Sequence, residues 1–110
     1  MSDPMTVEIL TFAGCPNAHA ARELVERVVA DERPDASIAS VTVWDAAGAE
    51  RLRFLGSPTI RVDGHDIEPG ADERTEYVLA CRIYRTPSRM TGIPDERWLR
   101  DALAARTAPS

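Results

Sequence analysis

Residues 6–32 read TVEILTFAGCPNAHAARELVERVVADE, and this stretch decides the fold. Its first part is a short apolar run with β-branched residues, which predicts a strand over residues 7–12. Its second part predicts a helix, because apolar residues recur there at the spacing of one buried helical face. These residues are Ala21, Leu24, Val25, Val28 and Val29. A strand, a turn at residues 13–14 and an amphipathic helix are the opening of an α/β fold.

A cysteine and a proline lie between the strand and the helix. We predict that Cys15 and Pro16 stand at the start of the helix, where proline is tolerated because the first-turn N–H has no intrahelical partner. We expect the turn to expose Cys15, and the positive end of the helix dipole favours its thiolate over the thiol. The thiolate is the form that attacks disulfides and binds soft metals. The alternative for Cys15 is a small residue with no chemistry.

Composition and charge limit the classes of function. The 110 residues are expected to form a single domain over residues 1–110, which can bury a core without disulfides. A net charge of -5 argues against nucleic acid as a general partner. All 13 basic residues are arginine, so no lysine is present for amine chemistry.

The sequence also bears on the compartment. Residues 1–5 lack the basic and apolar regions of a signal peptide, and no window reaches the ~18 apolar residues of a membrane span. We therefore expect a cytoplasmic protein without a membrane partner, as a monomer or a homodimer. In that compartment the two cysteines are expected to be catalytic, redox-sensing, metal-binding or inert, and not a persistent structural disulfide.

The middle of the chain continues the alternation of strands and helices. A second strand is predicted over residues 37–44, followed by a helix over residues 46–55 that Asp45 caps and Gly56 closes as the first residue beyond its end. Two short strands are predicted on either side of Asp63-Gly64, which is a strong hairpin signal.

The last third is less regular. Residues 75–85 have a strand-like composition but no clean period, and residues 86–91 are predicted to form a loop. A final helix is predicted from Pro94 to about Arg106, with its buried face on Trp98, Leu99 and neighbouring alanine and leucine residues. We expect both Trp44 and Trp98 to lie in the core.

The predicted order is β-α-β-α-β-β-α, with a mixed central sheet covered by helices on both faces and an extra segment at about residues 71–90. Two motifs give this order a resemblance to the thioredoxin fold family, closest to its small glutaredoxin-like members. They are GCPNA at residues 14–18 and GSPTIRVDG at residues 56–64. The chain is also similar to short bacterial proteins that are called thioredoxin-like or alkylmercury-lyase-like.

The resemblance implies roles for residues in both motifs. Cys15 would be the active cysteine, and Pro58 would be a cis-proline beside it. Pro16, Ser57, Pro58 and Thr59 would shape the substrate groove, because the backbone before this proline pairs with a bound thiol peptide in that family. The alternative for residues 57–59 is a plain strand start.

The sequence departs from the family pattern at the second cysteine. Ala18 stands where Cys-X-X-Cys proteins have that cysteine, so the motif cannot form an internal dithiol. The other thiol of the chain, Cys81, lies in the extra segment. It is either a resolving thiol brought over Cys15 to form a reversible disulfide, or a buried core cysteine. A disulfide needs the two Cα atoms within ~7 Å of each other.

Charged residues near the two cysteines have two interpretations each. Arg82, with Arg85 and Arg89, either places positive charge near Cys15 and selects an acidic or glutathione-like thiol substrate, or belongs to a solvated arginine face. His19, one helical turn after Cys15, either lowers the pKa of the thiol when protonated, joins it in a metal site, or lies on the solvent side of the helix.

The sequence therefore predicts two classes of function. The first is a thiol-disulfide oxidoreductase that uses one motif cysteine, Cys15, resolved by Cys81 or by an external thiol. It would have no resident cofactor and no metal site, with glutathione as a candidate co-substrate and a thiol, a disulfide or a protein as its partner. The alternative is a non-enzymatic binding protein of thioredoxin fold, which captures a soft ion such as copper or mercury, or a protein partner, through Cys15 and Cys81.

Overall fold

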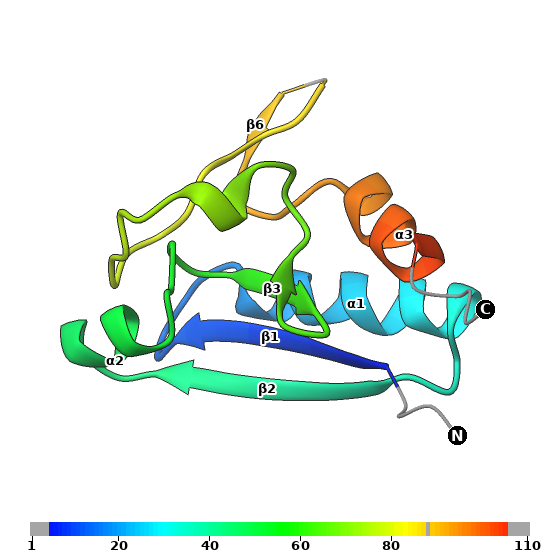
Figure 1. Ribbon diagram of the computed structural model, residues 1–110, viewed down its shortest axis with the longest axis horizontal. Helices are drawn as coiled ribbons and strands as arrows, with labels where there is room; N and C mark the ends of the chain where they lie inside the picture. Colours follow the sequence, from blue (N-terminus) through cyan, green and yellow to red (C-terminus); the bar gives the residue numbers. More distant parts are fainter. Residues whose placement is uncertain (1–4, 88, 106–110) are drawn as a thin grey trace.

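The computed structural model describes residues 5–87 and 89–105, and in it a four-stranded mixed sheet has the strand order β2-β1-β3-β4 (Figure 1). β2 runs parallel to β1, whereas β3 is antiparallel to β1 and β4 is antiparallel to β3. The mixed sheet predicted from the sequence is thereby confirmed. The strands are β1 (Thr6–Phe12), β2 (Ser37–Val43), β3 (Thr59–Val62) and β4 (His65–Asp66).

Three α-helices alternate with or follow these strands, and the predicted order of elements is present. An insertion before the last helix holds a short 3-10 helix, η1, and a hairpin of two-residue strands, β5 and β6. Among the described residues, no helix has the length and apolar content needed to cross a membrane. These elements are α1 (Ala18–Glu32), α2 (Ala46–Arg51), η1 (Ala71–Glu73), β5 (Tyr84–Arg85), β6 (Met90–Thr91) and α3 (Glu96–Ala105).

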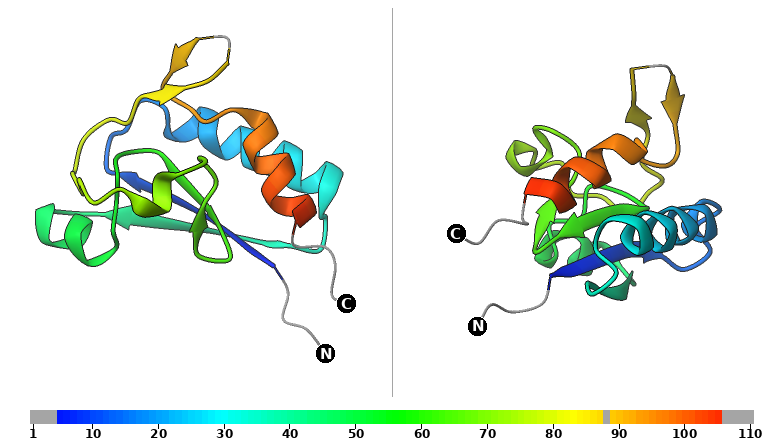
Figure 2. Two further views of the ribbon diagram at one scale, coloured as in Figure 1. Left: turned by 45° about the horizontal axis from the view of Figure 1, so that its top comes forward. Right: turned by 90° about the vertical axis from the view of Figure 1, so that its right-hand side faces the viewer.

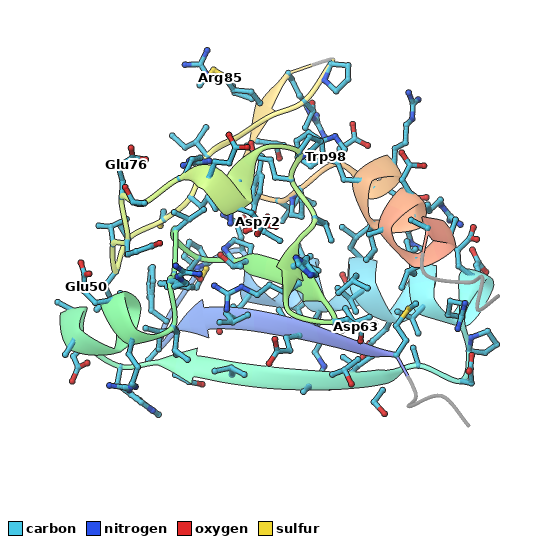
Figure 3. All side chains as sticks on the ribbon, viewed as in Figure 1. Glu50, Asp63, Asp72, Glu76, Arg85 and Trp98 are labelled. Carbon is cyan, nitrogen blue, oxygen red and sulfur yellow. The ribbon has the colours of Figure 1, made fainter. Side chains whose placement is uncertain are left out.

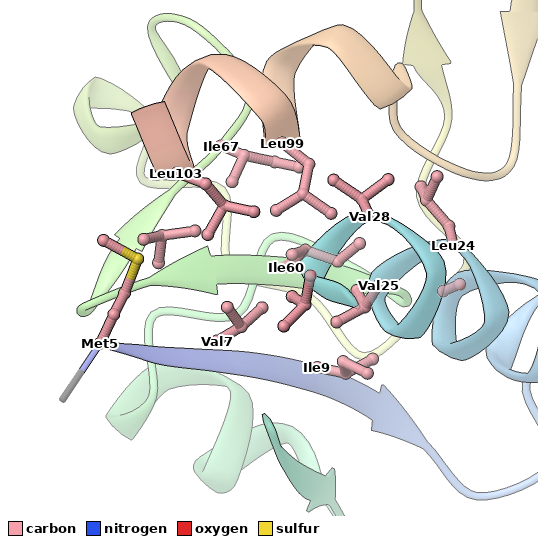
Figure 4. Close-up of a cluster of buried hydrophobic side chains, with 13 residues drawn as sticks. Met5, Val7, Ile9, Leu24, Val25, Val28, Ile60, Ile67, Leu99 and Leu103 are labelled. Carbon is pink, nitrogen blue, oxygen red and sulfur yellow. The ribbon is translucent and has the colours of Figure 1, made fainter. Parts of the chain in front are cut away.

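The main core lies between one face of the sheet and the two long helices, α1 and α3 (Figures 2 and 4). The five apolar residues predicted for the buried face of α1 are the buried residues of that helix. Leu99 and Leu103 of α3 pack beside them, over Ile60 and Val62 of β3. Trp98 is half-buried against this cluster, with its ring centroid 6.1 Å from that of Tyr84.

The second face of the sheet is covered over a smaller area than predicted. Leu10 and Val43 pack there against Ala49 of α2 and Phe54, at the end of the strands. Trp44 is 75% exposed, so the prediction that it belongs to the core was wrong. Because side chains alternate along an extended chain, Trp44 points away from the face on which Val43 is buried.

The end of α2 differs from the prediction. Asp45 caps the helix as expected, since its Oδ1 accepts the N–H of Gly48 at 2.7 Å. The helix ends at Arg51, however, and Arg53 takes the left-handed conformation that was assigned to Gly56. Its N–H bonds to the carbonyl of Glu50, and the next N–H bonds to the carbonyl of Ala49, which is the Schellman pattern of a helix end.

The two predicted turns in the last half have different outcomes. The Asp63-Gly64 hairpin is confirmed, with positive φ at both residues. Residues 86–91 were predicted to be a loop, but Met90 and Thr91 pair with β5. Strands of two residues are too short to show a period of two in the sequence. α3 begins at Glu96, two residues after Pro94, and the predicted end at Arg106 lies outside the described residues.

Candidate functional site

Cys15 lies in a tight turn between β1 and α1. Its N–H donates to the carbonyl of Phe12 at 3.2 Å, and its carbonyl accepts the N–H of Ala18 at 3.2 Å. Asn17 is the N-cap of α1, so Cys15 and the exposed Pro16 lie directly before the helix and not in its first turn, where the proline was predicted. Only 8% of Cys15 is exposed, which contradicts the expected exposure. The turn exposes its other residues and directs the cysteine inward.

Residues 57–59 form a buried segment beside that turn. The Ser57-Pro58 peptide is cis, as the resemblance implied. The Oγ of Ser57 accepts the N–H of Phe12 at 3.3 Å. This bond joins the segment to the end of β1, directly before the turn that holds Cys15. Thr59 is buried as well, and its hydroxyl donates to the carbonyl of Gly56 at 2.6 Å. Residues 57–59 are therefore fixed within the fold.

The backbone of Ser57 is paired with residues 80–82 of the same chain. The N–H of Ser57 donates to the carbonyl of Ala80 at 2.8 Å, and the N–H of Arg82 donates to the carbonyl of Ser57 at 2.9 Å. These two bonds make a parallel bridge between Ser57 and Cys81. The turn after β1 and the segment before β5 accordingly lie at the same end of the molecule (Figures 1 and 2).

Gly56 shows how closely this segment approaches. Its φ is +122°, and a Cβ added there would lie 2.9 Å from the Cβ of Arg82 and 3.2 Å from the carbonyl oxygen of Ala80. Only glycine has both the backbone freedom and the small size that this position requires. The glycine therefore serves the contact with residues 80–82, and not the end of α2.

Cys81 is exposed, and both cysteines are free thiols. The interpretation of Cys81 as a buried core cysteine was wrong, because its side chain reaches solvent. The backbone of Ser57 holds only its two neighbours, Ala80 and Arg82. Large apolar side chains are exposed on either side of it, at Leu79 and Ile83. The Ser57 side chain thus bonds to the strand end before Cys15, and the Ser57 backbone bonds to the residues on both sides of Cys81.

Arg82 is the anchor of the segment that carries Cys81. Only 3% of the residue is exposed, and its guanidinium donates to both oxygens of Asp66 at 2.8 and 3.2 Å. It also donates to Oε1 of Glu68 at 2.6 Å and to the hydroxyl of Thr59 at 2.9 Å. Its Cζ lies 4.4 Å from the ring centroid of Tyr84. The guanidinium therefore ties residues 80–84 to β3, β4 and the loop after them.

Burial and ion pairing shift the pKa values of Arg82 and of its neighbour Tyr84. Burial alone would lower the pKa of Arg82, but the nearby Tyr84, the hydrogen bonds to Asp66 and Glu68 and the charge of Asp66 together hold that pKa above its ordinary value. Burial also raises the pKa of Tyr84, whose neutral hydroxyl donates to the carbonyl of Pro58. The cluster is therefore a buried ion pair with a neutral phenol beside it.

Arg82 consequently does not offer its charge to a substrate, and it is not part of a solvated face; both interpretations of it were wrong. Its charge is balanced by Asp66 and Glu68 within the fold. Arg85 and Arg89 are exposed on the β5–β6 hairpin, and Arg85 extends away from the sheet (Figure 3). The pairing of Arg82 with Asp66 was missed because no local spacing links residues that far apart in the sequence.

The histidines take no part in this arrangement. His19 pairs with Glu23 at 3.3 Å on the exposed face of α1, so it lies on the solvent side of that helix. His65 pairs with Asp72 at 3.3 Å. Within residues 5–87 and 89–105, no group of three or more histidine, cysteine, aspartate or glutamate side chains is arranged to hold a metal ion.

No protein-family model matches this sequence, and none of the curated proteins matches it either. The site offers a shielded thiol, which follows the strand bonded to the Ser57 side chain, and an exposed thiol in the segment bonded to the Ser57 backbone.

Proposed function

We propose that this chain is a thioredoxin- or glutaredoxin-like thiol-disulfide oxidoreductase in which Cys15 and Cys81 act as a pair. The observation that carries the proposal is the set of hydrogen bonds around Ser57. Its side chain bonds to Phe12, whose carbonyl accepts the N–H of Cys15, and its backbone bonds to the residues on both sides of Cys81. The strand order and the position of Cys15 between β1 and α1 support the family assignment.

The exposure of the two thiols sets the order of the exchange steps. Cys81 meets an external disulfide first because it is exposed, whereas Cys15 is shielded. The Cys81 thiolate attacks one sulfur of the substrate, the substrate S–S bond breaks, and the first substrate thiolate leaves. The product of this step is a mixed disulfide between Cys81 and the substrate.

Cys15 then resolves that mixed disulfide. Its thiolate attacks the Cys81 sulfur, the bond to the substrate breaks, and the second substrate thiolate leaves. The two protons lost by Cys15 and Cys81 are taken up by the two departing thiolates. The substrate is reduced to two thiols while the protein is oxidised to a Cys15–Cys81 disulfide, and two molecules of an external thiol such as glutathione restore it.

Mass measurement after oxidation tests the proposal. The reduced protein is treated with glutathione disulfide, and so are the Cys15→Ser and Cys81→Ser variants. We expect the wild type to lose its two thiol hydrogens and gain no glutathione. We expect Cys15→Ser to accumulate one glutathione on Cys81, because the resolving thiol is absent. The double variant is the blank.

Two results would contradict this mechanism in different ways. Thiols that stay reduced in the wild type would rule out the oxidoreductase. If the wild type instead keeps one glutathione on Cys15, the protein is still an oxidoreductase, but it uses Cys15 alone. Cys81 then has no part in the reaction, which is the monothiol mechanism.

The second candidate is a non-enzymatic binding protein for a soft metal ion. It is favoured by the two free thiols, because thiolates select soft ions such as Cu(I) and Hg(II). Two results together would favour this candidate. The protein would take up one ion per chain only when both cysteines are present, and glutathione disulfide would leave its thiols reduced. A protein partner docked at the same thiols would give neither metal uptake nor a disulfide.

A further inference from the structure

A cavity of about 300 Å³ lies beside the β3–β4 hairpin, apart from the two cysteines. The loop after α2 supplies Arg53 to its lining, β3 supplies Arg61, and β4 supplies His65. The segment after η1 adds Arg74 and Tyr77. Four separate parts of the chain therefore bring cationic or hydrogen-bonding side chains to one hollow. Its volume is at the lower end of the range for small-molecule sites.

Arg61 is held in place by backbone carbonyl groups. Its Nη2 donates to the carbonyl of Leu52 at 2.7 Å and to the carbonyl of Arg53 at 2.9 Å. No ion pair within the described part of the chain includes Arg61 or Arg53. Neither guanidinium is therefore paired with a carboxylate in the described part of the chain.

The acidic residues of the lining are already paired. Asp66 is turned inward to the guanidinium of Arg82, and Asp72 pairs with His65. Arg74 pairs with Glu68 at 3.2 Å and approaches Glu76 at 3.8 Å. The lining holds three arginines and two aspartates, which leaves it one positive charge when His65 is neutral, in a chain whose net charge is -5.

Tyr77 adds a neutral donor to this charge. The residue is half-buried, and its backbone N–H donates to the carbonyl of Thr75 at 2.9 Å. Its hydroxyl has no hydrogen-bond partner among residues 5–87 and 89–105. The tyrosine ring and the side chain of Leu55 also give the cavity an apolar wall.

We propose that this cavity binds a small molecule that carries a phosphate or carboxylate group beside an apolar body. The planar guanidinium fork matches both kinds of oxyanion, and its charge-assisted hydrogen bonds are stronger than neutral ones. Arg61 and Arg53 provide the charge, Tyr77 provides a hydroxyl donor, and the apolar wall provides contact for the body of the ligand. The site is independent of the thiol chemistry, because neither cysteine lines it.

Titration of the full chain, followed by the shifts of backbone amide signals in NMR spectra, tests the proposal. The probes are phenyl phosphate, benzoate and inorganic phosphate. We expect saturable shifts at Arg61, His65 and Tyr77, with phenyl phosphate or benzoate binding more tightly than inorganic phosphate. Arg53→Gln should weaken binding about tenfold or more, since it removes a charged donor. Arg97→Gln, on the exposed face of α3, is the control and should leave the affinity unchanged.

The arms of the experiment also separate the two ligand chemistries. Binding of phenyl phosphate alone would assign a phosphorylated ligand, and binding of benzoate alone would assign a carboxylate. The proposal is overturned if none of the three probes gives saturable shifts, or if Arg53→Gln binds as tightly as the wild type. The proposal is also overturned if the amide signals shift near exposed arginines over the whole surface, because the anions would then bind without a specific site.

Discussion

Replacing Arg82 by methionine removes one charge from the interior and keeps most of the side-chain volume. In the native protein the guanidinium makes four hydrogen bonds, and Asp66 receives two of them. The Asp66 side chain is only 4% exposed, so water cannot replace the lost donors. Glu68 is more accessible and keeps its contact with Arg74. The largest penalty therefore comes from the Asp66 carboxylate, which is left buried without a counter-charge and keeps only the backbone N–H of Glu68, at 2.9 Å from its Oδ1.

Removal of one partner from a buried ion pair destabilises a protein by about 3–5 kcal/mol. A domain of this size has a free energy of unfolding of about 5–15 kcal/mol, so Arg82→Met should bring the protein close to its unfolding threshold. Adding Asp66→Asn should restore a large part of the loss, because the buried charge is then gone. The double variant separates the penalty for an unpaired charge from the loss of packing.

Urea denaturation followed by circular dichroism measures these changes. Arg97→Met serves as the matched control, because Arg97 is exposed and its loss should change the free energy of unfolding by less than about 0.5 kcal/mol. A destabilisation by Arg82→Met of less than about 1 kcal/mol would refute the reasoning, since it would place the pair among exposed salt bridges. The reasoning would also be refuted if adding Asp66→Asn made the Arg82→Met variant still less stable.

Three further substitutions test the packing and the pH dependence. Gly56→Ala should destabilise the protein by about 1–3 kcal/mol in urea denaturation, because its Cβ would meet Arg82 at a positive φ; an unchanged midpoint would contradict the close approach. Leu99→Ala, in the fully buried stripe of α3, should remove about 2–5 kcal/mol, measured in the same way. Hydrogen bonds from Arg27 and Arg100 lower the pKa of Glu96 below its ordinary value. Its contribution to stability is therefore fully present above the ordinary pKa of a glutamate and is lost as the pH falls through the lowered pKa. Glu96→Gln should therefore be less stable than wild type at neutral pH and equal to it in strong acid, and a difference that persists in acid would contradict this.

Local patterns in the sequence were sufficient for most of the architecture. The apolar spacing of α1 predicted its buried face, and Asp45 predicted the start of α2. The Asp63-Gly64 pair predicted the β3–β4 hairpin. Each of these features depends on interactions within a few residues of the chain, so a single sequence contains the information.

Features that depend on distant parts of the chain were predicted less well. Gly56 was assigned to the end of α2, but its conformation serves the contact with Arg82. Arg82 was interpreted as a surface cation because its partner, Asp66 of β4, lies far from it in the sequence. Trp44 was likewise assigned to the core, but it points away from the face on which Val43 is buried and is 75% exposed.

The two cysteines show the same division. The sequence by itself determined that one thiol follows the first strand and that the other lies in an insertion before the last helix. Only the tertiary structure decided that Cys15 is shielded, that Cys81 is exposed, and that Ser57 holds the segments of both. The physical reason is that exposure and backbone pairing arise from the packing of segments far apart in the chain, whereas strands, helices and turns arise from neighbouring residues.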